Sequence, residues 1–471
     1  MTQTPTDLHY LTAHEASGLL RDKKLSPVEL TRAFLDRIER LDGTLQSYIT
    51  VLGESALSDA REAEADIQRG DYKGPLHGIP IALKDLYDTE GVATTAGSKV
   101  LADRVPTEDA TTTARLKASG AILLGKLAMH EFALGGPDPT TGFPLARNPW
   151  NLDHIPGGSS SGSGAAVAAG LCMATLGSCT GGSIRGPASH CGIVGLKATY
   201  GRVSRYGVVP LSWTLDHCGP LTWNVEDSAM MLQSIAGRDP KDPTSSHAPV
   251  PDYSASLVDD IRGMRIGVPR HFFFRDDPRI SDEVLSTVDT ALEALRSLGA
   301  QVEEVSAPML GYAGAAQSVI MLSEAFAYHE GNLRSRPQDF GEMCRARFRI
   351  GGLFSGGDYV QAQRVRNVLN RELDELLETY DVIASPTMSN PAGTFEEAGV
   401  MTSARTPSFT GPYNLTGMPA ISVPCGFTES GLPIGLQLAG KPFDEPTIIR
   451  AAYTYQQHAR LYENRPPEPQ V

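Results

Sequence analysis

The sequence predicts an α/β protein in which a mixed β-sheet is flanked by helices. Between residues 74 and 223, short apolar stretches such as "IPIALKD" and "AILLGKL" alternate with Gly/Pro turns and Ala-rich helical pieces. This alternation is typical of strands connected by crossover helices. The strand pattern restarts at "MRIGVP" and returns at "YDVIASPT" and "AISVPCGF", so the sheet continues into the C-terminal half.

The first 70 residues predict helices. Ser26 is a capping serine followed by Pro27 at the first helical position, with Glu29 three residues after the cap. Apolar residues then follow at helical spacing, namely Leu30, Phe34, Ile38 and Leu41. Further predicted elements are a helix over 54–69, a helix carrying Val284, Leu285, Val288, Leu292 and Leu295, a strand at "QVEEV" and a final helix at "PTIIRAAYTYQQHAR".

The length of 471 residues by itself favours about two or three domains. The Pro-rich polar segment 239–252 is a candidate linker, but strand patterns on both sides of it favour one unit. We therefore expect a single domain over 1–471. Its parts are N-terminal helices in 1–70, a core with the motifs described below in 71–235, and a C-terminal half in 255–471 that completes the sheet and the substrate pocket.

The net charge of −14 disfavours a surface that binds nucleic acid or an anionic membrane. The N-terminus has no basic start before an apolar core, and the run "AAVAAGLCMATLG" is too short to span a bilayer. The 6 cysteines form no CxxC pair and no Cys/His cluster at metal-ligand spacing. We expect a cytoplasmic protein without metal or membrane contact, acting on a small molecule and not on nucleic acid.

Two glycine-serine clusters raise the question of function. "IPGGSSSGSGAAVAAG" covers residues 155–170, and "TGGSIR" covers residues 180–185. A Gly/Ser-rich run alone is usually a flexible linker, but linkers do not usually recur on both sides of an Ala-rich helical segment. Glycines in such turns expose backbone N–H groups, which bind a phosphate or the oxyanion of acyl transfer.

A serine nucleophile needs a base, and the chain offers two candidates. Residues 158–162 satisfy G-x-S-x-G, the nucleophile elbow of α/β-hydrolases, with His458 as a late histidine. The elbow requires a preceding strand, however, whereas "NPWNLDHIP" is turn-like. The other candidate is Lys84, at the end of an apolar run, where burial would favour its neutral amine; a solvated strand end is the simpler interpretation of that lysine alone.

Together, "GPLHGIPIALKD", "IPGGSSSGSGAAVAAG" and "TGGSIRGPASHCGIVGLKATYGRVS" resemble the amidase signature family of Ser-cisSer-Lys amidohydrolases. The resemblance covers nearly the whole chain and implies that family's fold, a mixed twisted sheet surrounded by helices. It implies that Ser183 is the nucleophile, that Ser159 is the bridging serine after a cis peptide bond, and that Lys84 is the terminal base. In this scheme neutral Lys84 takes a proton from Ser159, which takes one from Ser183 as it attacks the carbonyl.

The resemblance also implies an oxyanion hole formed by the backbone N–H groups of Thr180, Gly181, Gly182 and Ser183. Ser160 and Arg185 match positions that support the relay and the turn; for Arg185 the alternative is a surface salt bridge. Cys179 stands where many members carry an aspartate. As an alternative nucleophile it would lack a base beside it.

A second departure concerns the substrate. Glutamine-hydrolysing A subunits of tRNA-dependent amidotransferases usually carry an acidic residue just ahead of an "F-T-x-P-x-N" run, to hold the glutamine ammonium. Here Pro407 and Ser408 precede the run 409–414, while Arg347 still matches a basic position of that branch. We therefore expect a stand-alone amidase, and the glutamine-hydrolysing component of an amidotransferase is the alternative.

The expected reaction is hydrolysis of the C–N bond of an amide, either an aryl amide or anilide or a carbamate (urethane), through a serine acyl-enzyme without a cofactor. The expected partner is this small-molecule substrate, and a homodimer is the expected assembly if the chain associates. A non-catalytic anion-binding protein is a further alternative. The expected substrate pocket contains Met129, Leu134, Gly135 and Trp213, with Phe132, Tyr206, Phe354 and Tyr413 as further apolar walls.

Overall fold

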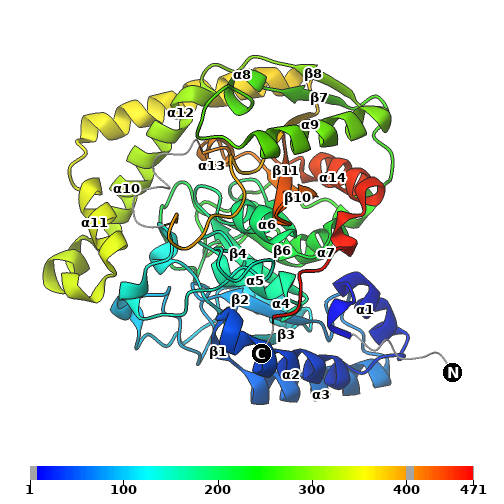
Figure 1. Ribbon diagram of the computed structural model, residues 1–471. Helices are drawn as coiled ribbons and strands as arrows, with labels where there is room; N and C mark the ends of the chain where they lie inside the picture. Colours follow the sequence, from blue (N-terminus) through cyan, green and yellow to red (C-terminus); the bar gives the residue numbers. More distant parts are fainter. Residues whose placement is uncertain (1–7, 399–407, 470–471) are drawn as a thin grey trace.

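The structure is a computed structural model that describes residues 8–398 and 408–469. Within these residues, a mixed β-sheet of eleven strands runs through the molecule (Figure 1). The strand order is β1-β3-β2-β4-β6-β5-β10-β11-β9-β7-β8. This confirms the predicted α/β class and its mixed sheet. The strands are β1 (Tyr48–Val51), β2 (Pro80–Lys84), β3 (Ile122–Leu127), β4 (Ala174–Cys179), β5 (Val194–Lys197), β6 (His217–Thr222), β7 (Arg265–Val268), β8 (Gln301–Glu304), β9 (Val382–Pro386), β10 (Ala420–Phe427) and β11 (Pro433–Gly440).

The sheet consists of two halves that follow the order of the chain. Strands β1 to β6 lie on one side and β7 to β11 on the other, and the halves meet where β5 pairs antiparallel with β10. In that pairing Lys197 lies opposite Ala420. Strand β2 is parallel to both of its neighbours, as is β7, whereas the other pairings are antiparallel.

Helices surround the sheet on all sides (Figure 1). Helices α2 and α3 lie below the blue N-terminal strands, α9 and α14 lie beside the C-terminal strands, and α10, α11 and α12 form an arm at the left of the view. The α-helices are α1 (Ala13–Arg21), α2 (Pro27–Leu45), α3 (Gly53–Arg69), α4 (Thr111–Ala118), α5 (Ser161–Ala168), α6 (Arg185–Cys191), α7 (Val225–Ile235), α8 (Arg270–Phe273), α9 (Asp282–Ser297), α10 (Leu310–Ser335), α11 (Glu342–Gly351), α12 (Gly356–Thr379), α13 (Gly411–Leu415) and α14 (Glu445–Ala459).

Helix α2 begins where the sequence predicts. The Ser26 hydroxyl accepts hydrogen bonds from the backbone N–H groups of Val28 and Glu29, which satisfies donors that the first helical turn leaves unpaired. The predicted apolar positions of α2 are buried against the core. The region 1–70 is not entirely helical, however, because β1 lies between α2 and α3 and pairs with β3. An edge strand of 4 residues is too short for its alternation to be read from sequence.

Five long cationic side chains, those of Lys84, Lys126, Arg185, Lys197 and Arg202, are fully buried in the core. Lys126 lies 3.3 Å from the Asp85 carboxylate, and Arg202 lies 3.4 Å from that of Glu445. Within the described residues, Lys84, Arg185 and Lys197 have no ion pair. A buried cation without a counter-charge is costly. Lys197 donates to the carbonyls of Ala198 and Met418, whereas Lys84 and Arg185 lie at the two glycine-serine turns and indicate a functional site there.

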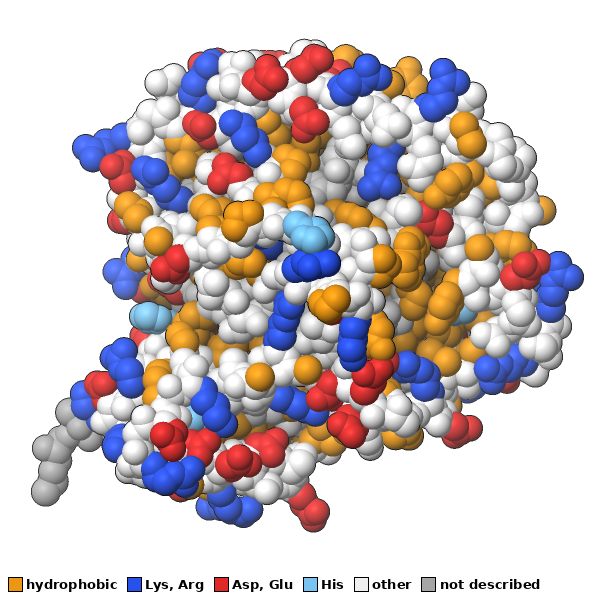
Figure 2. Space-filling view, turned by 180° about the vertical axis from the view of Figure 1, so that it is seen from behind, with side chains coloured by type: hydrophobic (Ala, Val, Ile, Leu, Met, Phe, Trp, Pro, Cys, Tyr) orange, Lys and Arg blue, Asp and Glu red, His pale blue; other side chains and the backbone are white. Residues whose placement is uncertain are grey.

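On the surface, acidic and basic side chains are mixed over the face seen from behind, with hydrophobic side chains gathered in hollows between them (Figure 2). In residues 8–398 and 408–469, no helix is both long enough and apolar enough to cross a bilayer. The same residues contain no cluster of three or more His, Cys, Asp or Glu side chains suited to a metal ion.

Candidate active site

Lys84 is the last residue of β2, an interior strand of the sheet that is buried along its whole length. Its ammonium nitrogen Nζ lies 2.7 Å from Ser159 Oγ and 2.8 Å from Ser178 Oγ. Both partners are neutral hydroxyls. The neighbouring Asp85 begins the turn after β2, and its carboxylate points elsewhere, where it pairs with Lys126 and accepts from the Thr95 backbone N–H.

Burial lowers the pKa of Lys84 to about 7. The physical cause is the loss of water around an ammonium group whose nearest partners are uncharged. A lysine with such a pKa is partly neutral at neutral pH, so it can accept a proton from a bound hydroxyl.

Ser159 lies in the turn before α5, and its side chain is buried. The peptide bond between Gly158 and Ser159 is cis, and the Ser159 carbonyl accepts a hydrogen bond of 3.0 Å from the His130 backbone N–H. A side chain at residue 158 would collide with the His130 ring, because an added Cβ would lie 2.0 Å from its Cε1 atom. The glycine is therefore required by the close approach of these two segments.

Ser183 lies in the turn between β4 and α6, half-exposed at the edge of a cavity of about 220 Å³. This cavity is also lined by Gly158, which precedes Ser159, and by Gly181 and Gly182. Within the described residues, the Ser183 hydroxyl has no hydrogen-bond partner. Catalytic hydrogen bonds are often long in unliganded enzymes and shorten when substrate binds, so this geometry is compatible with a relay from Ser183 through Ser159 to Lys84.

Residues 180–182 are held by groups from distant parts of the chain. Thr180 Oγ1 donates to the buried Asp216 carboxylate at 2.6 Å, and the Thr180 carbonyl accepts from Gln317 of α10 at 2.8 Å. Thr410 Oγ1 donates to the Gly181 carbonyl at 2.6 Å. Because the carbonyls of Thr180 and Gly181 are bound by distant groups, and that of Gly182 accepts from the Gly186 backbone N–H, this turn is held in a fixed orientation.

Arg185, which the sequence left as a supporting residue or a surface salt bridge, is fully buried behind this turn. Its guanidinium donates to the Thr410 carbonyl at 3.0 Å and to the side-chain oxygens of Asn414 and Gln437. It thereby joins the turn after β4 to the C-terminal half of the sheet. Ser160 is also buried, with Oγ 3.4 Å from the Ser178 carbonyl.

Cys179 lies directly before the turn and is also fully buried. Its Sγ atom lies 3.3 Å from Asn414 Oδ1 and 3.7 Å from the Arg185 guanidinium. It does not line the cavity at Ser183, so this position gives it no access to a substrate carbonyl.

A wider cavity of about 710 Å³ adjoins the one at Ser183 and shares Gly158, Met388 and Ser389 with it. Of the four expected pocket residues, Gly135 lines this wider cavity. Met129 and Leu134 lie in the hydrophobic core and line neither of the two cavities. Trp213 is 55% exposed and lines a separate cavity beside Ser178.

The other apolar residues expected to line the substrate pocket do not lie together in one cavity either. Tyr206 lines the separate cavity beside Ser178, whereas Phe132 and Tyr413 are buried in the core and Phe354 packs against it. Apolar residues near a motif are more often core than pocket, since the same composition serves both.

The nucleophile-elbow alternative lacks its structural context. Residues 148–158 form turns and isolated bridges with no strand directly before Ser159, and His458 lies in α14. The structure also adds residues that the sequence did not single out, above all Ser178, Asp216 and Gln317. A polar residue inside a buried strand could have marked Ser178, but nothing local marks Gln317, which comes from a helix 137 positions away.

Comparison with known proteins decides the family. The model of the family described as Amidase matches residues 29–449. The chain belongs to the amidase family. It is therefore a hydrolase of amide C–N bonds, which confirms the resemblance seen in the sequence.

Three relatives illustrate the range of the family. The glutamyl-tRNA(Gln) amidotransferase A subunit of Moorella thermoacetica is 45% identical over 98% of this chain and 99% of its own length. The structure of the A subunit of the same name from Thermotoga maritima is 36% identical, covers 96% of each chain and gives a TM-score of 0.82. A structure described as an unexpected vestigial protein complex, which reveals the origins of an s-triazine catabolic enzyme, gives 36% identity and a TM-score of 0.89 over 95% of this chain and 98% of that chain.

These names correct one expectation. The prediction that nucleic acid plays no part is wrong, because relatives matching almost the full length are named as subunits of an enzyme of glutamyl-tRNA(Gln). The net charge was a poor guide to nucleic-acid binding because it averages over the whole surface and does not reveal a local basic region. Between residues 333 and 371 the chain carries eight arginines against three acidic residues, despite its overall charge of −14.

Proposed function

We propose that this chain hydrolyses glutamine as the A subunit of an amidotransferase acting on glutamyl-tRNA(Gln). The relatives of that name support this proposal over the stand-alone aryl-amide or carbamate hydrolase expected from sequence, because they match 96–98% of the chain at 43–45% identity. The residue that carries the proposal is Arg347.

Arg347 of α11 is half-buried with its guanidinium beside Gly135, which lines the wider cavity; a Cβ atom added to this glycine would lie 3.8 Å from Arg347 Nη1. Burial lowers the pKa of Arg347, and within the described residues no carboxylate pairs with it. A partly desolvated guanidinium without a counter-ion is suited to a ligand carboxylate, which it can bind in bidentate fashion.

The ammonium group of an amino acid needs negative charge nearby. The acidic residue usual ahead of the run 409–414 is absent, and Pro407 lies outside the described residues. Glu283 and Glu397 line the same wider cavity as Gly135 and place carboxylates there. With Arg347 beside Gly135, groups of both signs therefore lie at or next to this cavity, as binding of a zwitterion requires.

In the proposed reaction neutral Lys84 accepts the Ser159 proton while Ser159 accepts that of Ser183, whose Oγ attacks the side-chain carbonyl of glutamine. The N–H groups of residues 180–183 stabilise the resulting oxyanion. The C–N bond breaks as the relay returns a proton to nitrogen and ammonia leaves. Water then attacks the acyl-serine, releasing glutamate and restoring the Ser183 hydroxyl.

The test compares glutamine with butyramide, an amide that lacks both charged groups. The Arg347→Met substitution should reduce the preference for glutamine over butyramide, in kcat/KM, by about 30-fold or more, since truncating one partner of a buried charge pair costs at least about 2 kcal/mol. Arg349→Met, which changes an exposed arginine two residues away, is the matched control. An unchanged preference in the Arg347 variant would refute the glutamine assignment.

A second candidate is the hydrolysis of aryl amides or carbamates. Ser408 favours it, because this neutral side chain lines the cavity at Ser183 close to where an acidic residue would hold glutamine. The deciding assay measures kcat/KM for glutamine, a nitroanilide and a nitrophenyl carbamate on the isolated chain. An aryl substrate preferred by tenfold or more would place this candidate first.

A further inference from the structure

A separate cavity of about 260 Å³ lies beside Ser178 and shares no lining residue with the two cavities near Ser183. The segment 205–218 forms most of its wall, together with residues 241–243, Ala133 and Tyr328 of α10. Ser178 belongs to the lining and accepts a hydrogen bond from Lys84. The cavity therefore lies next to the relay without opening onto the nucleophile.

The lining is mainly aromatic and aliphatic. The rings of Tyr206, Trp213 and Tyr328 contribute to it, and the aliphatic part of the wall consists of Val208, Val209, Pro210 and Leu211. A cavity of roughly 150 Å³ lined by apolar side chains is large enough to hold benzene. This cavity is larger, so it has room for one substituted aromatic ring.

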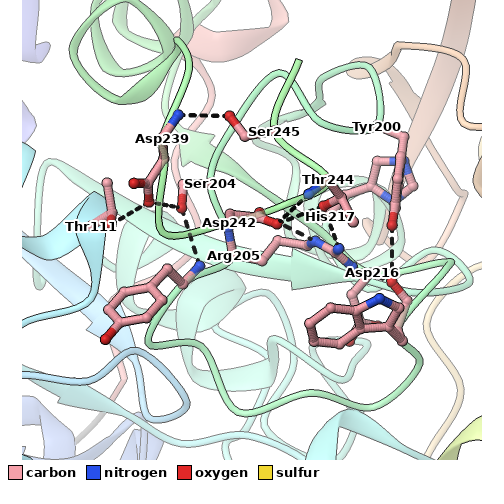
Figure 3. Close-up of polar contacts among 12 residues, drawn as sticks. Thr111, Tyr200, Ser204, Arg205, Asp216, His217, Asp239, Asp242, Thr244 and Ser245 are labelled. Carbon is pink, nitrogen blue, oxygen red and sulfur yellow. Dashed lines mark hydrogen bonds and ion pairs between the residues drawn. The ribbon is translucent and has the colours of Figure 1, made fainter. Parts of the chain in front are cut away.

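The charged groups of the lining already have partners. Arg205 turns toward Asp242 and Thr244 (Figure 3), with Nε 3.7 Å from the Asp242 carboxylate and Nη2 2.6 Å from Thr244 Oγ1. Lys241 pairs with Glu108 at 2.8 Å. Asp216 accepts from Thr180 Oγ1 and from two backbone N–H groups. A charged ligand would meet no unpaired counter-charge here and would lose its hydration, which favours a neutral one.

His217 is a lining residue whose side chain has a hydrogen-bond acceptor that lacks a donor. Its Nδ1 atom lies 2.6 Å from the Leu215 carbonyl, and a carbonyl only accepts hydrogen bonds, so Nδ1 carries the proton. Burial lowers the pKa of His217, so the ring is neutral and its Nε2 atom is an acceptor. This buried Nε2 has no hydrogen-bond partner within the described residues, although the side chain is only 3% exposed.

We propose that this cavity is a binding site for a neutral aromatic molecule bearing one N–H or O–H donor, of the class of aromatic amines and phenols. The ring would pack against Tyr206, Trp213 and the aliphatic wall, and its donor would meet His217. A molecule bound there would contact Ser178, which holds Lys84, and Asp216, which holds Thr180 of the turn before Ser183. The proposal does not depend on glutamine as the substrate.

The experiment titrates the full chain with aniline and phenol at neutral pH and follows tryptophan fluorescence. The chain has 3 tryptophans, so a Trp213→Phe variant identifies the reporting residue. We expect saturable binding in the millimolar range, as small ligands of about seven heavy atoms give, and at least about tenfold weaker binding of benzoate and benzylammonium. Binding of the charged probes as tight as that of aniline would overturn the proposal, as would the absence of saturable binding by either neutral probe.

Two cavity-filling variants locate the probe. Val209→Phe fills this cavity and should weaken aniline binding by about tenfold or more, whereas Met388→Phe, in the cavities near Ser183, should leave binding in place. The opposite pattern would place the probe at the nucleophile and refute the proposal. If Val209→Phe does not fold, His217→Leu provides the second test, because it should remove the preference for aniline over toluene.

Discussion

Lys84 and Lys126 show how the surroundings of a lysine determine its chemistry. Both are fully buried on neighbouring strands, but Lys126 faces the Asp85 carboxylate at 3.3 Å, whereas Lys84 faces only two hydroxyls. In the sequence Lys84 and Asp85 are adjacent and resemble an ion pair. Strand β2 ends at Lys84 and Asp85 begins the turn that follows, so the two side chains face different partners. Lys84 is left without a counter-charge, as the proposed base requires, and Asp85 is a structural partner of Lys126.

The pKa of Lys84 predicts a pH dependence. Only the neutral amine can accept a proton, so kcat/KM should rise with pH through about 7 and then level off. Lys84→Ala should remove this rise together with most of the activity. The measurement is a pH profile of kcat/KM over the acidic to alkaline range, and a rise that persists unchanged in the variant would assign it to another group.

The two serines are expected to respond differently to removal. Ser183→Ala should abolish turnover because the attacking oxygen is lost. Ser159→Ala keeps the nucleophile but interrupts proton transfer, so kcat should fall by about 100-fold or more. Mass spectrometry with a slowly hydrolysed substrate should find the acyl group on Ser183, and an adduct on Ser160 would contradict the assignment.

Candidate residues of the relay could be proposed from the sequence because each lies in a short motif with its own glycines or apolar run. The residues that hydrogen-bond to the two turns and fix their position could not be proposed from the sequence. Asp216 and Gln317 reach Thr180 from 36 and 137 positions away, and Asn414 reaches Arg185 from 229 positions away. A hydrogen bond over such a separation leaves no local pattern, since it depends on the folded sheet.

At the scale of single elements, the turn from β4 into α6 places Ser183 between a buried strand and a buried helix. Gly182 has φ +149°, and an added Cβ would lie 2.2 Å from Thr410 Oγ1. Both the backbone conformation and the close contact demand glycine. This explains why the second glycine of the motif cannot carry a side chain.

Gly182→Ala should therefore displace the turn and reduce kcat by about 100-fold or more, as the loss of one oxyanion donor does. Gly70→Ala is the matched control. Gly70 also has a positive φ, of +93°, at the end of α3, but an added Cβ there meets nothing within 4 Å. We expect the control to lose some stability and to retain its kcat, and equal activity of the Gly182 variant and the parent would show that the turn tolerates a shift.

The predictability of the elements follows their burial. Strands β2, β9 and β10 were foreseeable as apolar runs because they are buried on both faces. Helices α10 and α12, with 26 and 24 residues, were not foreseen, although α12 begins with a capping box formed by Ser355 and Asp358. In these two helices, Gly, Arg and polar residues interrupt the helical spacing of apolar residues. The helices bury fewer side chains than the strands of the sheet do, so the sequence carries a weaker signal for them.

At the scale of the whole molecule, the carboxylate of Asp227 joins the start of helix α1 to the body, beside the apolar contacts of α1 with the core. Asp227 of α7 accepts hydrogen bonds from the backbone N–H groups of Ala13 and His14, at 3.0 and 2.8 Å, at the start of α1. Burial raises the pKa of Asp227 to about 7. The unfolded value is about 3.9, so the folded protein holds this proton over a wider pH range than the unfolded chain.

The sign of the resulting pH dependence follows from this difference. A raised carboxyl pKa contributes stability that is fully present below about pH 4 and is lost as the pH rises through about 7, on the order of 4 kcal/mol at most. Relative to Asp227→Asn, the parent should lose thermal stability between about pH 4 and 7. Tm measurements of both proteins test this, with the exposed Asp36→Asn as control, and a difference that stays constant over this range would contradict it.

The junction of β5 and β10 has a consequence for the order in which the protein is made. Lys84, Ser159 and Ser183 all leave the ribosome early, on the half-sheet of β1 to β6, whereas Thr410, Asn414 and Gln437 leave it near the end of translation. A nascent chain thus carries all three groups of the proposed relay before the turn around Ser183 is held in place. We expect hydrolysis to begin only when the last strands have docked, which keeps an unfinished chain from attacking amides during synthesis.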